Sequence, residues 1–114
     1  MTTISLKNLD HSFDLRLGEV GVTVRAGTKW QIDVGTKFKL VEQYTDNSME
    51  FRVGYGKAIG WWSGKFNDVP QPLLSMEHNV AARDRWVLFN MMQAGYGDDF
   101  SGKSIVTALI YERI

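Results

Sequence analysis

The chain has 114 residues, the length of one ordinary domain, and we expect residues 1–114 to form a single domain. Thirteen basic and thirteen acidic residues give a net charge of zero, so bulk charge does not indicate a polyanionic partner. Cysteine is absent, which excludes disulfides and a thiol nucleophile and fits a reducing, cytoplasmic compartment. We find neither a signal-peptide pattern nor an apolar run near the ~20 residues of a membrane span, and expect no membrane association.

Four segments carry the patterns that predict β-strands. Three valines within residues 20–25 alternate with Gly21, Thr23 and Arg25, which is typical of a half-buried strand. Further strands are predicted over residues 37–44, 50–61 and 105–113, with a polar turn at residues 45–48. The last strand is apolar on both faces, so we place it centrally in the sheet. The third contains three glycines, which indicate a bulge or a close backbone approach: Gly54, Gly56 and Gly60.

The main helix is predicted over residues 79–94, with Ser75 or Asn79 as its cap and Gly95 as its stop. Its apolar stripe is formed by Val80, Val87, Leu88, Met91, Met92 and Ala94. Asp84 and Arg85 fall inside or beside this stripe. Residues 8–17 fit a short helix or a strand equally well.

The order of these elements is strands, then a helix, then a returning strand. This order favours an α+β fold, in which a small curled sheet or a β-barrel carries one principal packed helix. A βαβ fold would instead alternate its strands and helices along the chain.

The strong catalytic and metal-binding motifs are absent from the sequence. It contains no phosphate-binding glycine loop, nucleophile elbow or His-Glu-x-x-His pattern. The two histidines, His11 and His78, are far apart in sequence, and we interpret each as a surface or capping residue. We therefore expect neither a metal nor a cofactor.

The pair Trp61-Trp62 lies close to two lysines, Lys57 and Lys65. Aromatic rings near lysines can stack on bases while the cations hold phosphate. Alternatively, one tryptophan enters the core and its neighbour, pointing the other way, covers the sheet edge.

The segment Leu17-Gly-Glu-Val-Gly-Val-Thr-Val-Arg25 resembles the signature of the ASCH family, in which a glycine is soon followed by Lys-x-x-Thr-x-Arg. Residues 34–40, Val-Gly-Thr-Lys-Phe-Lys-Leu, are similar to the family's second element, a Val-Gly-Asp that leads into a strand. A further strand, a helix, a loop containing Tyr96 and a closing strand follow in matching order. The resemblance therefore extends over nearly the whole chain, through short motifs.

This resemblance implies a PUA-like barrel with a cleft and a role with RNA or modified nucleosides. Some ASCH members are acetylcytidine amidohydrolases that use a lysine, a threonine and a glutamate. Thr23 matches the threonine, and Glu77, just before the predicted helix, is the candidate for the glutamate. The lysine position falls on Val20, which can supply no charge, and Lys29 in the next loop is the nearest replacement.

Our leading hypothesis is an RNA- or nucleoside-binding module with a basic cleft. The candidate ligand-binding residues are Arg25, Lys29, Trp61, Lys65 and Tyr96. Arg25 offers a planar fork suited to phosphate or carboxylate. One alternative is an acylated-nucleoside amidohydrolase with Thr23 and Glu77 as catalytic residues. Structural roles also explain both residues, since threonine favours strands and glutamate favours helix starts. Another alternative is an accessory protein that acts through a protein interface.

Overall fold

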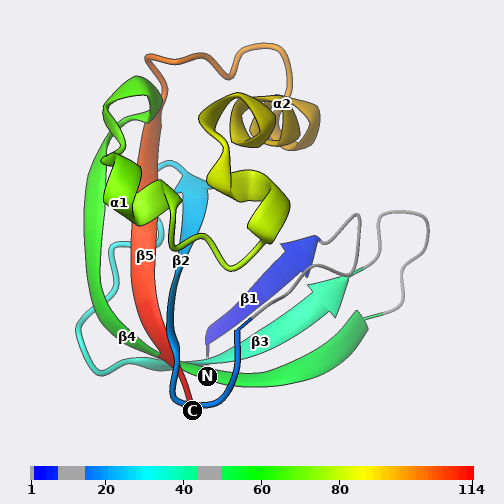
Figure 1. Ribbon diagram of the computed structural model, residues 1–114, viewed down its shortest axis with the longest axis vertical. Coiled ribbons are helices and arrows are strands. Elements are labelled where there is room, and N and C mark those ends of the chain that lie inside the picture. Colours follow the sequence, from blue (N-terminus) through cyan, green and yellow to red (C-terminus); the bar gives the residue numbers. More distant parts are fainter. Residues whose placement is uncertain (1, 8–14, 44–49) are drawn as a thin grey trace.

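The computed structural model describes residues 2–7, 15–43 and 50–114, with side chains for 15–41 and 54–114 (Figure 1). The strands are β1 (Thr2–Lys7), β2 (Val20–Ala26), β3 (Lys37–Gln43), β4 (Glu50–Lys65) and β5 (Ile105–Arg113). The α-helices are α1 (Gln71–Leu74) and α2 (Arg85–Tyr96), and the 3-10 helices are η1 (Phe66–Asp68) and η2 (Val80–Arg83). None of the helices in these ranges is long and apolar enough to span a bilayer.

The five strands form one curled sheet in the order β1-β3-β4-β5-β2 (Figure 1). β1 pairs with β3 in parallel, and all other pairs are antiparallel. The sequence predicted an α+β fold with a curled sheet, and the structure confirms it. The described strands form a half-barrel with β1 and β2 at its two edges. β5 pairs on both sides, which confirms its interior position.

β4 is longer than predicted, because it continues past Trp61 to Lys65. Ser63 and Gly64, which lie beyond the predicted end of the strand, pair with Thr107 and Val106 of β5. The Ser63 hydroxyl also donates to the Val106 carbonyl oxygen at 2.9 Å. Pairing with the long interior strand β5 thus extends β4 past its predicted end.

The glycines of β4 have the two roles that the sequence indicated. The register of β4 against β5 shifts between Ala58 and Gly60, which is a bulge. At Gly56 a β-carbon would lie 2.5 Å from the ring of Phe38, so only glycine leaves room for that ring.

The predicted limits of the main helix are wrong at both ends. Asn79 caps η2 instead, by accepting from the Ala81 amide, and the chain leaves helical geometry at Asp84. Asp84 is the cap of α2, since its carboxylate accepts from the Val87 amide at 3.0 Å. The helix passes Gly95 and ends before Gly97, whose φ of 97° favours glycine.

The later start also changes which side chains α2 buries. Leu88 and Met92 are buried, whereas Val80 and Val87 of the predicted stripe are exposed. Arg85 lies at the first position of the helix and bonds to main-chain carbonyls. These hydrogen bonds explain why an arginine lies beside the predicted apolar stripe.

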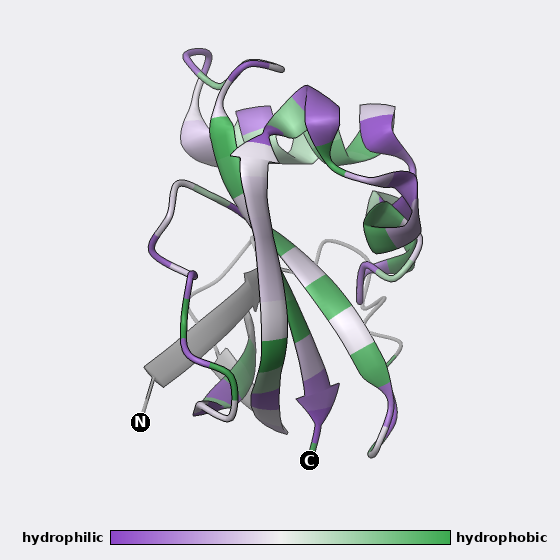
Figure 2. Ribbon diagram, turned by 90° about the vertical axis from the view of Figure 1, so that its left-hand side faces the viewer, coloured by the Kyte–Doolittle hydropathy of each residue, from purple (hydrophilic) through white to green (hydrophobic). Residues whose placement is uncertain are grey.

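Two apolar clusters occupy the opposite faces of β5, because its residues alternate between them. The first cluster joins β2 and β5 to the helices through Val22, Val24, Phe66, Val69, Leu74, Ala82, Leu88, Met92, Phe100, Val106 and Ala108. The second cluster consists of Leu15, Trp30, Phe38, Leu40, Ala58, Leu109 and Tyr111. Figure 2 shows the alternation of apolar and paler residues along the strands. The helices thus cover one face of β5.

Three elements of the structure, β1, η1 and α1, were not predicted from the sequence. β1 is an edge strand whose residues 2–7 pair with residues 38–43. α1 spans four residues and begins directly after Pro70. The predicted turn at residues 45–48 lies outside the described residues. So do residues 8–14 of the segment predicted as a helix or strand.

Candidate functional site

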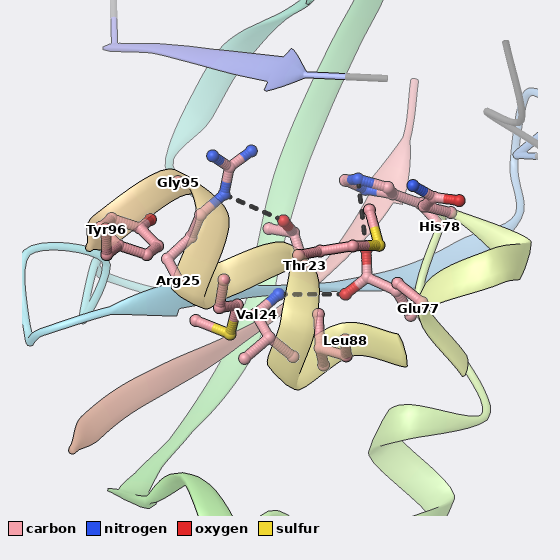
Figure 3. A pocket seen from close by; sticks show the side chains of 12 residues that line it. Thr23, Val24, Arg25, Glu77, His78, Leu88, Gly95 and Tyr96 are labelled. Carbon is pink, nitrogen blue, oxygen red and sulfur yellow. Dashed lines mark hydrogen bonds and ion pairs between the residues drawn. The ribbon is translucent and has the colours of Figure 1, made fainter. Parts of the chain in front are cut away.

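A cavity of about 250 Å³ lies beside β2, between that strand, the segment before η2, and α2 (Figure 3). We call it the β2 pocket. It is lined by Thr23, Val24, Arg25, Glu77, His78, Asn79, Ala82, Leu88, Met91, Met92, Gly95 and Tyr96. Its walls therefore come from three parts of the chain that are far apart in sequence.

The segment between α1 and η2 reaches the pocket by pairing with the free edge of β2. The Val22 amide donates to the Met76 carbonyl oxygen, and the His78 amide donates to the Val22 carbonyl oxygen, both at 2.9 Å. These two bonds form a short parallel bridge between Val22 and Glu77. Oε2 of Glu77 then accepts from the Val24 amide at 3.1 Å. The carboxylate thus takes the place of the next main-chain partner along the edge.

Glu77 is buried, with 4% of its surface exposed. Burial disfavours the charged carboxylate and raises its pKa from 4.5 to about 8. The positive charges of Arg25 and Arg83 and the amides of Val24 and Asn79 oppose this rise. Glu77 can therefore both donate and accept a proton near neutral pH.

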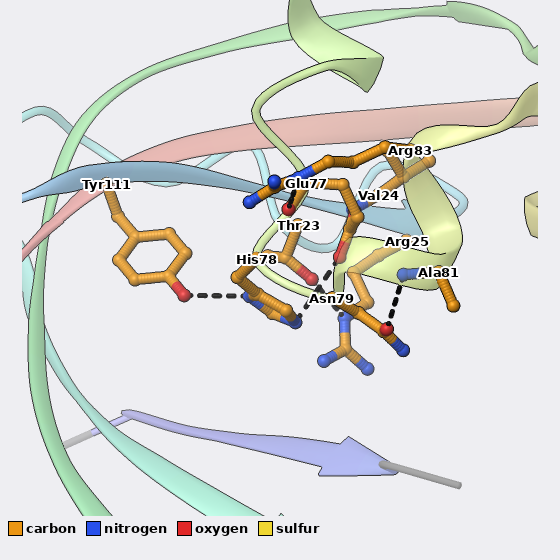
Figure 4. Close-up of polar contacts among 9 residues, drawn as sticks. All are labelled: Thr23, Val24, Arg25, Glu77, His78, Asn79, Ala81, Arg83 and Tyr111. Carbon is orange, nitrogen blue, oxygen red and sulfur yellow. Dashed lines mark hydrogen bonds and ion pairs between the residues drawn. The ribbon is translucent and has the colours of Figure 1, made fainter. Parts of the chain in front are cut away.

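His78 connects Glu77 to the core of the sheet (Figure 4). Its Nε2 lies 3.3 Å from Oε1 of Glu77, and its Nδ1 lies 2.7 Å from the hydroxyl oxygen of Tyr111. Burial, together with Arg25 and Arg83, lowers the His78 pKa to about 3, so the imidazole is neutral at pH 7. The interpretation of His78 as a surface or capping residue is therefore wrong, since its side chain is buried and contacts Glu77 and Tyr111.

Arg25 and Thr23 extend from the same side of β2, and Arg25 points over Thr23 (Figures 3 and 4). Nε of Arg25 donates to Oγ1 of Thr23 at 3.1 Å. Arg83 approaches from η2, and its Nε donates to the Glu77 carbonyl oxygen at 2.9 Å. Arg25 lines the pocket whereas Arg83 does not, so the guanidinium of Arg25 is the group of the polar wall that favours an anionic or carbonyl-bearing ligand group.

The opposite wall of the pocket is apolar and comes from α2. Leu88 and Met92 are buried there, and Met91 is partly buried beside them. Tyr96, at the end of the helix, also lines the pocket and is 50% exposed. An aromatic ring in this position can stack on a planar ligand.

The structure brings together four of the seven residues selected from the sequence. Thr23, Arg25, Glu77 and Tyr96 line the β2 pocket, and the remaining three do not: Lys29, Trp61 and Lys65. Lys29 is exposed, and its Nζ lies 5.5 Å from the ring centre of Trp30. Val20, at the family's lysine position, does not line the pocket either.

Trp61 and Trp62 alternate between the two faces of β4. Trp62 packs against the first apolar cluster, while Trp61 is 44% exposed. Trp61 pairs with Leu109 of β5, and Trp62 pairs with Ala108. This arrangement agrees with the structural interpretation of the pair, in which only one ring enters the core.

Sequence reasoning missed His78 as a pocket residue, and it gave Arg83 and Tyr111 no role at the site. The run Glu77-His78-Asn79 offered a signal, because three consecutive polar residues lie close to apolar segments. Tyr111 offered none, since its contact with His78 joins residues 33 positions apart.

Within the described ranges, no group of three or more metal-ligating side chains is close enough to hold a metal ion. Comparisons with models of protein families, with curated proteins and with solved structures found no match to this chain. The fold and the β2 pocket therefore define the protein only as a curled α+β domain with a mixed polar and apolar pocket beside β2.

Proposed function

We propose that the β2 pocket binds a nucleoside, either free or as a base of single-stranded RNA. The observation that carries this proposal is the pairing of a hydrogen-bonding wall with an apolar wall in one cavity. A heteroaromatic base needs both, because its edge carries donors and acceptors while its faces are apolar.

The polar wall suits the edge of a base. Glu77 accepts hydrogen bonds as a carboxylate and also donates one as a neutral acid. The guanidinium of Arg25, already held by Thr23, suits a carbonyl oxygen or a phosphate. A cavity of about 250 Å³ is small for a ligand site, so we expect it to enclose the base and leave the ribose outside.

The apolar wall suits the faces of the same base. Met91 and Met92 are flexible and polarisable, which allows close contact with an aromatic ring. The half-exposed ring of Tyr96 can stack on the base or on a neighbouring one. Our proposal also includes a PUA-like relationship through the ASCH resemblance and a cytoplasmic location.

Titration of the labelled protein tests this function. Amide spectra are recorded at low salt with cytidine, acetylcytidine and a short single-stranded RNA. We expect shifts around Arg25, Glu77 and Tyr96, and at least a tenfold affinity loss in Arg25→Ala, since a charge-assisted hydrogen bond is lost. Lys29→Ala is the matched control, because it removes a nearby cation that does not line the pocket.

A well-dispersed spectrum that no nucleoside or RNA perturbs would refute the proposal. The same refutation follows if Arg25→Ala and Lys29→Ala lose affinity equally. A pull-down would then test the remaining alternative, an accessory protein that acts through a protein interface.

A second candidate function is hydrolysis of an acylated nucleoside. The specific observation is that Glu77 and Thr23 line the same cavity, with Arg25 bound to the Thr23 hydroxyl. Ionised Glu77 would take a proton from a water molecule that attacks the amide carbonyl. Acetylcytidine and water would then give cytidine and acetic acid, with the proton returned to the leaving amino group. Arg25 would stabilise the negative charge on the carbonyl oxygen.

A product assay with acetylcytidine tests this second candidate. We expect Glu77→Gln to abolish cytidine release, because an amide cannot accept the proton, and Lys29→Ala to retain it. Binding without release would eliminate hydrolysis and leave the binding function in place. Release that survives both Thr23→Ala and Glu77→Gln would show that other residues carry the reaction.

A further inference from the structure

The binding described above uses Glu77 but not the contacts that link Glu77 through His78 to Tyr111. Glu77 and His78 are adjacent in sequence, and Tyr111 comes from β5, on the far side of β2 in the sheet. Figure 4 shows the imidazole between the phenol and the carboxylate. Three buried polar side chains in line are costly to maintain unless each is hydrogen-bonded.

The protons in this chain can be assigned from chemistry. A phenol is a stronger hydrogen-bond donor than a neutral imidazole N–H, and burial raises the Tyr111 pKa, so its hydroxyl stays protonated. The hydroxyl therefore donates to Nδ1 of His78 at 2.7 Å. The bond at one ring nitrogen fixes the tautomer, so the imidazole proton lies on Nε2. Nε2 is the atom that faces Oε1 of Glu77 at 3.3 Å.

We propose that His78, with its tautomer fixed by Tyr111, is a positioning residue that donates to Glu77 and keeps its carboxylate available as a proton acceptor in the β2 pocket. This role rests on the proposed function, because it matters only if the pocket uses Glu77. His78 acts through Glu77 and requires no contact with the ligand. Tyr111 acts one step further away.

The donors around Glu77 show why such a residue is needed. Oε2 accepts from the Val24 amide, the Asn79 amide donates as well, and His78 holds the other oxygen. Burial works against these bonds and favours the neutral acid. The charged and titratable groups that face Glu77 are Arg25 of β2, Arg83 of η2, the adjacent His78 and Tyr111 of β5. Among these, His78 is the only neutral side chain that donates directly to the carboxylate.

The first experiment uses the wild-type protein and no ligand. Long-range proton–nitrogen correlation spectra at pH 8.5, where most of Glu77 is ionised, report the tautomer of each histidine. We expect His78 to carry its proton on Nε2, and His11→Gln assigns the signals by removing the other histidine. A proton on Nδ1 instead would overturn the proposal.

The second experiment measures the ionisation of Glu77 directly. The carboxyl carbon of Glu77, assigned through Glu77→Gln, is titrated by NMR in the wild type, in Tyr111→Phe and in the control Tyr96→Phe. We expect a wild-type midpoint near pH 8 and an upward shift of roughly one pH unit in Tyr111→Phe, because the tautomer is no longer fixed. Tyr96→Phe removes a hydroxyl from the same pocket and is expected to leave the midpoint unchanged.

An unchanged midpoint in a folded Tyr111→Phe protein would overturn the proposal. If Tyr111→Phe does not fold, the proposal is still tested by the tautomer of His78 in the wild-type protein. Neither experiment contains a nucleoside, so a result against the role of His78 is distinct from a result against nucleoside binding. Conversely, a pocket that binds no nucleoside leaves the tautomer and the midpoint measurable.

Discussion

The two polar centres on either side of the first apolar cluster are built on different principles. Arg85, at the start of α2, donates only to main-chain carbonyl oxygens, those of Phe66, Asn67 and Val69. Glu77 lies among groups that can gain or lose protons. Carbonyl groups do not titrate, so the contribution of Arg85 to folding should not depend on pH. The comparison teaches that stability should depend on pH only at the centre whose partners include ionisable side chains.

The largest expected effect belongs to the apolar support of the Arg85 centre. Phe66 is 1% exposed and contacts the rings of Phe89 and Phe100. We expect Phe66→Ala to lower the free energy of unfolding by about 3–5 kcal/mol, since it leaves a cavity in the core. Denaturant unfolding measures this loss, with the exposed Lys103→Ala as control. A loss below about 1 kcal/mol would contradict the close packing of these three rings.

Removing the Arg85 side chain is expected to have the next largest effect. Arg85→Ala removes three hydrogen bonds to main-chain carbonyl groups, of which that of Phe66 keeps the Val69 amide as donor, and we expect a loss of about 2 kcal/mol in the free energy of unfolding. The loss should be equal at pH 5 and pH 8, because no partner titrates. Unfolding at both pH values checks this. A loss that differs between them would break the comparison between the two centres.

The Glu77 centre is expected to make stability depend on pH in two opposite ways. The pKa of Glu77 rises on folding from 4.5 to about 8, so its contribution is complete below pH 4.5 and is lost as the pH rises to about 8. The pKa of His78 falls from 6.5 to about 3, so its contribution is complete above pH 6.5 and is lost as the pH falls. Between pH 4.5 and 6.5 the two slopes cancel.

We therefore expect a plateau of stability between pH 4.5 and 6.5 and a decline above it. The slope of the decline approaches about 1.4 kcal/mol per pH unit, the value for one proton. Glu77→Gln should remove the decline between pH 6.5 and 8, because glutamine does not titrate. Chemical unfolding at half-unit steps of pH measures both proteins. A decline that persists in Glu77→Gln would assign it to another group.

Much of the sheet could be predicted because local pattern and final environment agree there. In β5, both faces are apolar in the sequence and both are buried in the structure, which fixed its interior place. Gly56 indicated a close approach, and the ring of Phe38 occupies that space. The helix start was misplaced because Asn79 and Asp84 are both good caps. Only the tertiary contacts decide that Asn79 begins a short 3-10 turn and Asp84 begins the helix.

Less of the pocket could be predicted, because its geometry depends on long-range contacts. Thr23 and Glu77 were selected through resemblance, and their shared pocket arises from the pairing of residues 76–78 with β2. Nothing local indicates that His78 is buried or that it meets Tyr111. Trp61 and Lys65 are near in sequence and chemically suited to bases, yet β4 carries them on a strand two positions from β2.

The smallest expected effect concerns that aromatic and basic segment of β4. Trp61→Ala and Lys65→Ala remove side chains that are exposed and do not line the β2 pocket. We expect each to change the affinity for a single nucleoside less than twofold, against at least tenfold for Arg25→Ala, since neither is part of the cavity wall. The nucleoside titration that tests Arg25 measures all three. A loss in Trp61→Ala as large as that in Arg25→Ala would move the ligand from the β2 pocket to β4, and the proposed role of Glu77 would fall with it.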